Sequence, residues 1–183
     1  MWAALEVGRQ LDADDVMVVL IPDSGRGYLS KLYNDEWMAD FGFLRAGGQT
    51  VADVLQRKAS DLPSLVHVHP DDTVGTAIDI LREYEVSQLP VIKAEPPVMA
   101  AEVLGSIVER DLLGALLAGR ARPADPASKH MSAPLPMVGS GEPVSRAVEA
   151  LEKAGAAVVL EGGKPVGMLT RQDVLGFLAK VTP

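Results

Sequence analysis

Two stretches of the sequence repeat one layout of polar and apolar residues. Gly105–Asp111 (GSIVERD) and Gly167–Asp173 (GMLTRQD) each run from a glycine through an apolar strand end to an aspartate at the start of a helix. A carboxylate there can accept hydrogen bonds from both hydroxyls of a ribose, and the N–H groups of a helix N-terminus favour negative charge. The duplication predicts two copies of a unit that holds a small ligand.

The second junction carries the fuller set of polar groups. Thr170 supplies a hydroxyl that can contact a sugar or a phosphate, and Asp173 supplies the carboxylate. At the first junction Asp111 keeps the carboxylate, but Val108 stands in the place of the hydroxyl. Because Thr-x-x-Asp is also a helix-capping arrangement, a ligand contact and a helix cap both stay open as interpretations of Thr170 and Asp173, and the same two interpretations stay open for Asp111.

Composition excludes several function classes. The 183 residues include no cysteine, which excludes disulfides, thiolate catalysis and zinc–thiolate sites. A net charge of −8 disfavours nucleic acid and anionic membranes as partners. No apolar run reaches the roughly 18 residues of a membrane span, and no secretory signal is visible. We therefore expect a soluble cytoplasmic protein.

The apolar periodicity predicts two β-α-β-β-α units, an α/β (α+β) fold. Val74 and Val144 occupy matching helix positions at an offset of 70 residues. The first unit has expected strands at 65–68, 88–92 and 103–108 and helices at 73–85 and 111–117. The second has strands at 136–138, 156–160 and 166–170 and helices at 144–153 and 172–180. One unit is too small to cover its sheet, so the two should pack together.

The segment before the repeats has a different character. We expect a helix at 3–11, an unbroken apolar strand at 16–21 and short helical patches at 29–34 and 36–41. A strand of that kind normally lies inside a sheet covered on both faces, and nothing else before Gly48 supplies neighbouring strands. We therefore interpret residues 1–46 as the tail of a larger domain, 47–64 as a linker helix capped at Thr50, and 65–122 and 123–183 as the two units.

Histidine and arginine residues give weaker signals. His67 and His69 lie on one face of an extended segment, but with no carboxylate at a fixed spacing we expect a structural pair and no metal site. Arg110 and Arg171 at helix starts are candidates to meet a phosphate or carboxylate, although solvated arginines are the simpler interpretation.

Together, the two units and their Gly-x-x-x-x-x-Asp junctions resemble a pair of CBS (cystathionine β-synthase) domains, the Bateman module. Residues 20–31 (LIPDSGRGYLSK) and 34–38 (NDEWM) resemble the end of the catalytic domain of cystathionine β-synthases, which has the type II fold of pyridoxal-phosphate enzymes. The resemblance implies that Ser24 holds the pyridine nitrogen of pyridoxal phosphate in an intact parent enzyme, whose Schiff-base lysine lies upstream. Lys31 is the only nearby candidate for such a lysine, and we interpret it as a solvated helix residue. This chain alone is therefore expected to have no catalytic residues.

The resemblance also implies a function and a site. It implies a regulatory module that binds S-adenosylmethionine or an adenine nucleotide (AMP or ATP), forms a homodimer and changes the activity of the linked catalytic domain. The family site draws on a strand edge of the first unit, where this chain has Val86 and Ser87 in place of the frequent aromatic and acid. The expected ligand-binding residues are Val86, Ser87, Gln88, Leu89, Met168, Thr170, Gln172 and Asp173, with Asp111 at a second site.

Two other function classes stay open at this point. The departures at Val86, Ser87 and Val108 favour a structural dimerisation module without a ligand. An active pyridoxal-phosphate enzyme would instead show the colour of a lysine aldimine.

Overall fold

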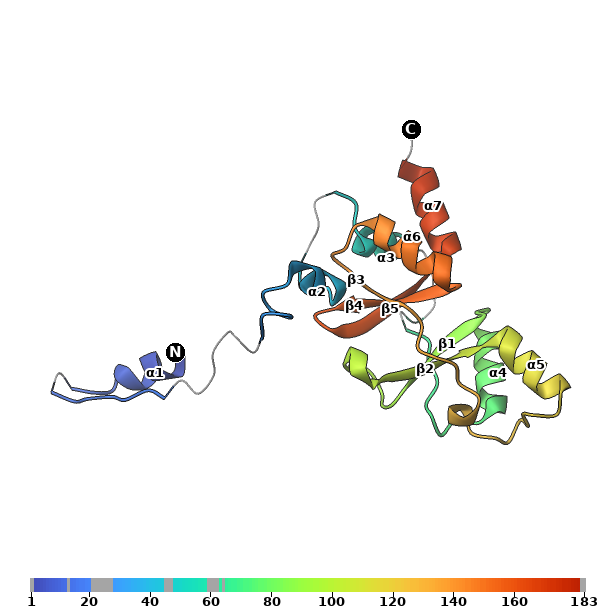
Figure 1. Ribbon diagram of the computed structural model, residues 1–183, viewed down its shortest axis with the longest axis horizontal. Helices are drawn as coiled ribbons and strands as arrows, with labels where there is room; N and C mark the ends of the chain where they lie inside the picture. Colours follow the sequence, from blue (N-terminus) through green and yellow to red (C-terminus); the bar gives the residue numbers. More distant parts are fainter. Residues whose placement is uncertain are drawn as a thin grey trace.

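A computed structural model of the chain describes residues 2–12, 14–20, 28–44, 48–58, 63 and 65–181. Figure 1 shows two lobes of helices and strands side by side, with a thin arm that carries the first helix away from them. Each lobe corresponds to one of the repeats in the sequence. The mixed helix and strand architecture expected from the sequence is therefore confirmed.

The first lobe is built on an antiparallel pair of strands. β1 (Gln88–Ile92) pairs with β2 (Val103–Val108), with Gln88 opposite Val108. Helices α4 (Val74–Glu83) and α5 (Glu109–Leu117) flank the pair, and a short 3₁₀ helix, η2 (Ala100–Glu102), precedes β2. Thr73 caps α4, since its side chain accepts a hydrogen bond from the N–H of Thr76 at 3.0 Å.

The second lobe has a three-stranded sheet in the order β3-β4-β5. β3 (Met137–Gly139) lies parallel to β4 (Ala156–Glu161), which runs antiparallel to β5 (Lys164–Thr170). Helices α6 (Val144–Lys153) and α7 (Arg171–Val181) cover it. The linker from the first lobe contains the 3₁₀ helix η3 (Ala127–Lys129). The turn between β4 and β5 needs glycine, because Gly162 and Gly163 have φ values of 55° and 77°.

The expected strand at 65–68 is reduced to a single bridge between Val68 and Val91. The N–H of Val68 donates to the carbonyl of Pro90, and the N–H of Ile92 donates to the carbonyl of Val68. The next bond would require an N–H at position 90, which proline lacks. In the second lobe Val158 supplies that N–H and donates to Pro136 at 2.8 Å. This one substitution explains why β3 forms and its counterpart does not.

Helix α3 (Val51–Arg57) packs into the second lobe although it precedes the first in the sequence. Val51 and Val54 are fully buried in the core that α6, α7 and β5 form. At its start Thr50 donates its N–H and its hydroxyl to Asp53 Oδ2 at 2.8 and 2.9 Å, which confirms the expected cap. After the end of α3, Lys58 donates from its ammonium group to the carbonyl of Met168 in β5 at 3.1 Å.

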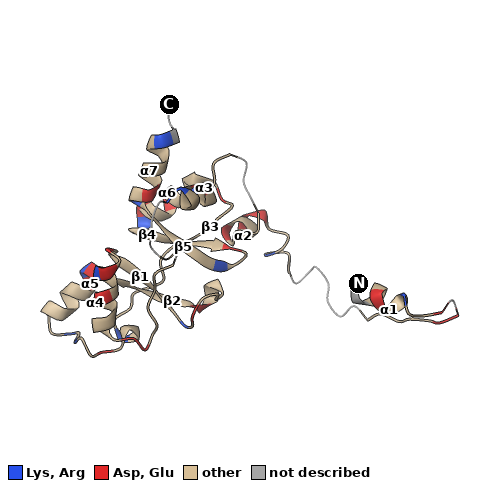
Figure 2. Cartoon of the chain, turned by 180° about the vertical axis from the view of Figure 1, so that it is seen from behind, with Lys and Arg blue, Asp and Glu red and all other residues tan. Residues whose placement is uncertain are grey.

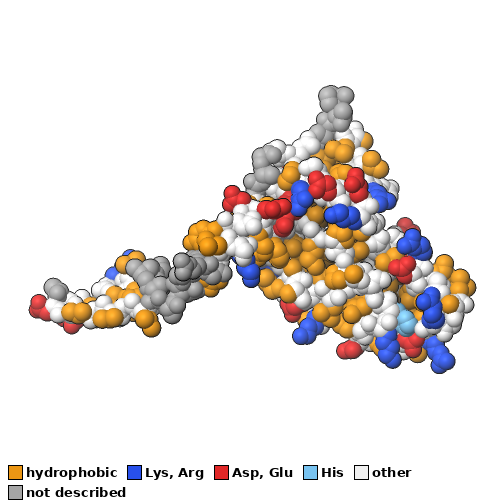
Figure 3. Space-filling model, in the orientation of Figure 1, with side chains coloured by type: hydrophobic (Ala, Val, Ile, Leu, Met, Phe, Trp, Pro, Cys, Tyr) orange, Lys and Arg blue, Asp and Glu red, His pale blue; other side chains and the backbone are white. Residues whose placement is uncertain are grey.

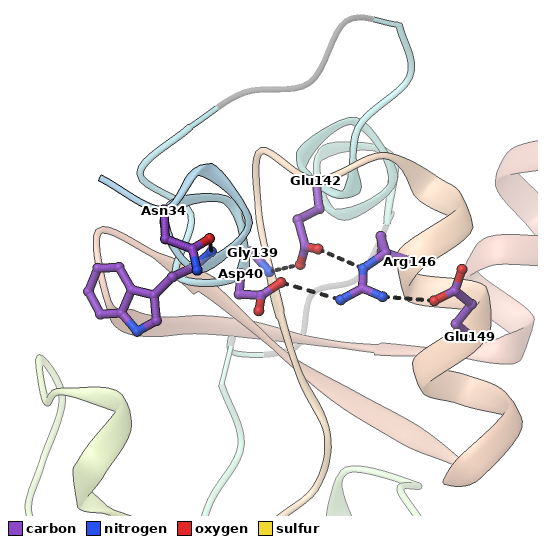
Figure 4. Close-up of polar contacts among 7 residues, drawn as sticks. Asn34, Asp40, Gly139, Glu142, Arg146 and Glu149 are labelled. Carbon is purple, nitrogen blue, oxygen red and sulfur yellow. Dashed lines mark hydrogen bonds and ion pairs between the residues drawn. The ribbon is translucent and has the colours of Figure 1, made fainter. Parts of the chain in front are cut away.

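A short helix from the front segment also packs on the second lobe. α2 (Asp35–Asp40) lies over Gly139, where a Cβ atom would overlap the carbonyl oxygen of Ala39. Figure 4 shows the polar contacts beside it: Arg146 reaches Asp40 at 3.4 Å and Glu142 at 3.1 Å. Burial raises the pKa of Glu142, while the N–H of Gly139 at 2.6 Å opposes that rise. Part of the front segment is thus integral to the second lobe.

The rest of the front segment lies apart from both lobes. The helix α1 (Trp2–Gly8) is shorter than expected, and residues 16–20 form no strand because no neighbouring strand is present among the described residues. Val16, Val18 and Leu20 are 85–89% exposed, and Figure 3 shows hydrophobic side chains along the arm. Residues 29–33 form turns instead of a helix. Ser24 lies outside the described residues.

No described helix combines the length and the apolar character that crossing a bilayer requires.

Candidate functional site

A cavity of about 620 Å³ lies between the two lobes. This volume is within the range of about 300–1,000 Å³ that small-molecule sites occupy. Its walls come from the end of α4 and the start of β1 in the first lobe, from β5 and α7 in the second, and from the end of α3. The lining residues are Lys58, Pro63, Val66, Tyr84, Glu85, Val86, Ser87, Gln88, Met168, Thr170, Gln172 and Asp173. Seven of the residues expected from the sequence are therefore brought together in one place.

Asp173 is the best-connected polar group of this cavity. Its Oδ2 accepts hydrogen bonds from the N–H of Thr170 at 2.7 Å and from the hydroxyl of Thr170 at 2.8 Å. The N–H of Asp173 returns a bond to that hydroxyl at 3.3 Å. The same pattern of bonds occurs at Thr50 and Asp53. Thr170 and Asp173 therefore do form a helix cap, and a ligand contact would come in addition to it. Within the described part of the chain, all bonds to the Asp173 carboxylate end on Oδ2, so Oδ1 has no partner there.

Lys58 is a residue of the cavity that the sequence did not reveal. From the end of α3 its ammonium group lies 3.2 Å from Asp173 Oδ2 and donates to the carbonyl of Met168 at 3.1 Å. The two charged side chains are 27% and 16% exposed. No local pattern identifies this contact, because 115 residues separate the partners.

The first lobe contributes the residues that follow α4. Glu85 has a φ of 51°, a left-handed conformation that turns the chain out of the helix and brings Val86, Ser87 and Gln88 to the cavity rim. Leu89 does not line the cavity. It is fully buried in the core of the first lobe, because successive strand side chains point to opposite faces.

A second cavity, of about 550 Å³, surrounds Asp111 and is built from the matching elements. Val108 precedes α5 without any side-chain cap, and the Asp111 side chain is 49% exposed with Arg110 Nε at 3.5 Å. Acidic and basic residues accordingly gather at one end of α5 in Figure 2. The linker at residues 132–136 also lines this cavity. The hydroxyl of Ser106 holds the linker in place by donating to the carbonyl of Ala133 at 2.7 Å.

Arg171 does not belong to the cavity of Asp173. Its guanidinium donates two hydrogen bonds to the carbonyl of Leu151, at 2.9 and 2.7 Å, and lies on the side of the Asp111 cavity. Two arginines are candidate partners for a phosphate. Arg110 is exposed, whereas the guanidinium of Arg171 already donates to a backbone carbonyl.

The two histidines of the first lobe gain a carboxylate partner that the sequence spacing did not reveal. Glu95, in the loop after β1, lies 3.0 Å from His69 Nε2 and 3.7 Å from His67 Nε2. The hydrogen bond that Glu95 accepts from His69 raises the pKa of His69, and partial burial opposes this rise. The third histidine, His130, pairs separately with Asp125 at 3.1 Å. The N–H of Arg122 and, after it, the hydrogen bond with His130 lower the pKa of Asp125.

Comparison with known proteins agrees with the duplicated fold. The sequence model of the CBS domain matches residues 51–118 and 127–180. The chain is 28% identical over 98% of its length to the cystathionine β-synthase of Dictyostelium discoideum, and 32% identical over 70% of its length to that of Mus musculus. It spans only 38% and 23% of the length of these two relatives.

Solved structures of the same fold include several CBS-domain proteins. One from Agrobacterium tumefaciens has a TM-score of 0.57 at 25% identity, covering 73% of this chain and 97% of its own. A CBS-domain protein of Pyrobaculum aerophilum, complexed with AMP, has a TM-score of 0.57 at 22% identity over 72% of this chain and 99% of its own. A CBS pair complexed with 5′-methylthioadenosine and S-adenosyl-L-methionine has a TM-score of 0.57 at 20% identity, covering 73% of this chain and 98% of its own. The chain therefore belongs to the CBS domain family, carries two of its domains in tandem, and is similar to the C-terminal region of cystathionine β-synthases.

Proposed function

We propose that this chain is the regulatory part of a cystathionine β-synthase-like enzyme and binds an adenosyl ligand in the cavity of Asp173. The observation that carries the proposal is the meeting of Thr170 and Asp173 of one domain with Val86, Ser87 and Gln88 of the other around one cavity. Asp173 Oδ1 would accept the ribose hydroxyls, while Val86 and Met168 would flank the purine. Complexes of proteins with the same fold with AMP and with S-adenosyl-L-methionine support this choice of ligand class.

Charge favours S-adenosylmethionine over a nucleotide in this cavity. Its charged lining residues are Glu85, Asp173 and Lys58, so acidic groups outnumber basic ones. The lining of the Asp111 cavity includes Arg110, Lys153 and Arg171 against Glu109 and Asp111. A sulfonium ion is attracted to the first environment, whereas a phosphate is better suited to the second. We therefore place S-adenosylmethionine beside Asp173.

The regulatory role follows from where the ligand would act. A ligand between the lobes stabilises one arrangement of the two domains, and it shifts any linked equilibrium by its differential affinity for the two states. Lys58 connects the cavity to α3, and residues 35–40 of the front segment pack on the second domain. In a parent enzyme, a pyridoxal-phosphate catalytic domain would precede these residues, with Ser24 at the pyridine nitrogen of its cofactor. A change in the arrangement of the two CBS domains would be transmitted to it through α3 and residues 35–40. The chain itself is not proposed to catalyse a reaction.

A second proposed property is assembly into a homodimer. Leu113, Leu117 and Leu175 on α5 and α7 are 55–82% exposed. Two apolar grooves of similar make-up lie between α4 and α5 and between α6 and α7. Exposed apolar patches of this kind mark association surfaces. A ligand-free dimerisation module is therefore the competing function.

Thermal unfolding with ligands separates the two functions. A ligand that binds the native state raises its stability by about 2.7 kcal/mol at a concentration of 100 Kd. We expect the melting temperature to rise with S-adenosylmethionine, and to rise less with AMP or ATP. A melting temperature that stays constant with all three ligands would leave only the dimerisation module.

A further inference from the structure

The histidine pair of the first domain forms, with one glutamate, a cluster outside the adenosyl cavity. His67 and His69 alternate along the segment that precedes α4, and Glu95 faces them from the loop that follows β1. One ligand atom from each of the three residues lies within 4.8 Å of the other two. None of the three lines the cavity of Asp173. The cluster therefore needs an explanation of its own.

Backbone contacts define which nitrogen of each ring faces the glutamate. His67 Nδ1 lies 3.1 Å from the carbonyl of Leu65, and His69 Nδ1 lies 3.0 Å from the carbonyl of Ile92. A carbonyl oxygen only accepts hydrogen bonds, so each Nδ1 carries the proton. In the neutral rings the lone pairs then belong to the two Nε2 atoms, which both point at the Glu95 carboxylate. Histidines that ligate metals are oriented by the same kind of bond from the opposite nitrogen.

The distances match the spacing of ligand atoms around a small metal ion. With metal–nitrogen and metal–oxygen bonds of about 2.0–2.2 Å, adjacent ligand atoms of a tetrahedral site lie about 3.3 Å apart. The two observed separations, 3.0 Å from His69 Nε2 to Glu95 Oε1 and 3.7 Å from His67 Nε2 to Glu95 Oε2, lie on either side of that value. The three groups need only small side-chain movements to share one ion.

A second carboxylate adds negative potential at the cluster. Asp72 accepts the N–H of His69 at 2.7 Å, and Glu95 Oε1 lies 3.0 Å from His69 Nε2. A divalent cation between the two Nε2 atoms and the Glu95 carboxylate would be attracted by both negative charges.

We propose that His67, His69 and Glu95 bind a divalent transition-metal ion of the zinc class. Two imidazoles and one carboxylate are a donor set that suits zinc, and imidazole nitrogen disfavours magnesium and calcium, which prefer oxygen. The Glu95 side chain is 79% exposed, so the fourth position opens to water. The ion would fasten the loop after β1 to the segment before α4, independently of any adenosyl ligand.

The test is calorimetric titration of the metal-free 183-residue chain with zinc and, separately, with magnesium. We expect one equivalent of zinc to bind with release of protons, and no magnesium binding. Glu95→Gln removes a ligand from an exposed position and leaves the core intact. This variant and His69→Gln should bind zinc more than about 10-fold more weakly, since even outer contacts of a metal site contribute about 10- to 100-fold.

His130→Gln is the matched control, because His130 also pairs with a carboxylate but has no second imidazole beside it. It should bind zinc as the unchanged chain does. The proposal is overturned if the unchanged chain takes up no zinc. It is equally overturned if Glu95→Gln binds zinc with unchanged affinity while its melting temperature shows that it is folded.

Discussion

Positions 69 and 139, related by the offset of 70 residues between the two domains, use one backbone frame for different purposes. In each domain a carboxylate three residues further on accepts the N–H of this position: Asp72 accepts that of His69 at 2.7 Å, and Glu142 accepts that of Gly139 at 2.6 Å. The first domain places an imidazole there and meets Glu95. The second has no side chain there, and α2 fills the space.

The two cavities differ in the same way. Their elements correspond, but Thr170 and Asp173 form a complete polar junction in one, while Val108 leaves Asp111 exposed in the other. Their third walls differ as well, since Lys58 closes one and the linker at residues 132–136 closes the other. The backbone frame is therefore alike in the two domains, whereas the side chains that line the two cavities differ. Each prediction below exchanges or removes one of these differences.

The largest effect on stability is expected at Gly139. Gly139→Ala introduces a Cβ atom where Ala39 already lies, and overpacking of this kind costs about 1–3 kcal/mol. Urea unfolding should show this loss, and α2 should be displaced with a change in the fluorescence of Trp37. Gly176→Ala is the control, because no atom lies within 4 Å of its added Cβ and alanine favours the helix. Equal stability of both variants would disprove the close docking of α2.

Exchanging the residue that distinguishes the two junctions should have a smaller effect. Thr170→Val gives the second junction the residue of the first, and loss of a helix cap costs about 1 kcal/mol. Val108→Thr restores the hydroxyl at the first junction. It should raise the free energy of unfolding by at least a few tenths of a kcal/mol. Urea unfolding of the two variants measures both changes. If both variants lose stability equally, the asymmetry of the junctions has no energetic basis.

The smallest expected effect concerns the preference of the Asp173 cavity for ligands of different charge. Lys58→Met removes the ammonium group beside Asp173, so S-adenosylmethionine should bind more tightly and AMP more weakly. A partly exposed charge of this kind contributes up to about 1 kcal/mol, which corresponds to about 2- to 5-fold in affinity. Competition binding measures the ratio of the two affinities. Lys153→Met, in the other cavity, should leave this ratio unchanged; a shift of equal size would place the ligand elsewhere.

The elements of the two domains could be predicted because their information is local. Helices α4 and α6 follow from apolar residues at helical spacing, and the turn at Gly162 and Gly163 follows from glycine. The loss of a strand at 65–68 also has a local cause, the missing N–H of Pro90, and that proline is present in the sequence of the partner strand.

What could not be predicted depends on contacts between distant residues. The end of α3 reaches Asp173, Glu95 reaches His67 and His69, and Arg171 turns to the carbonyl of Leu151. Each contact joins segments whose mutual placement only the folded chain defines. The strand expected at 16–21 was wrong over its described residues for a related reason, since an apolar run becomes a strand only beside a partner.

The central claim, that one cavity of the pair binds an adenosyl ligand through Asp173, is tested most directly by calorimetry with S-adenosylmethionine. The unchanged chain is compared with Asp173→Asn, which keeps an oxygen for the N–H of Thr170, and with Asp111→Asn as the matched control. Hydrogen bonds to a charged group contribute about 1.5–3 kcal/mol, so Asp173→Asn should weaken binding by about 10- to 100-fold. Asp111→Asn should bind as the unchanged chain does. Equal affinity of the unchanged chain and Asp173→Asn, or a larger loss in Asp111→Asn, would contradict the assignment.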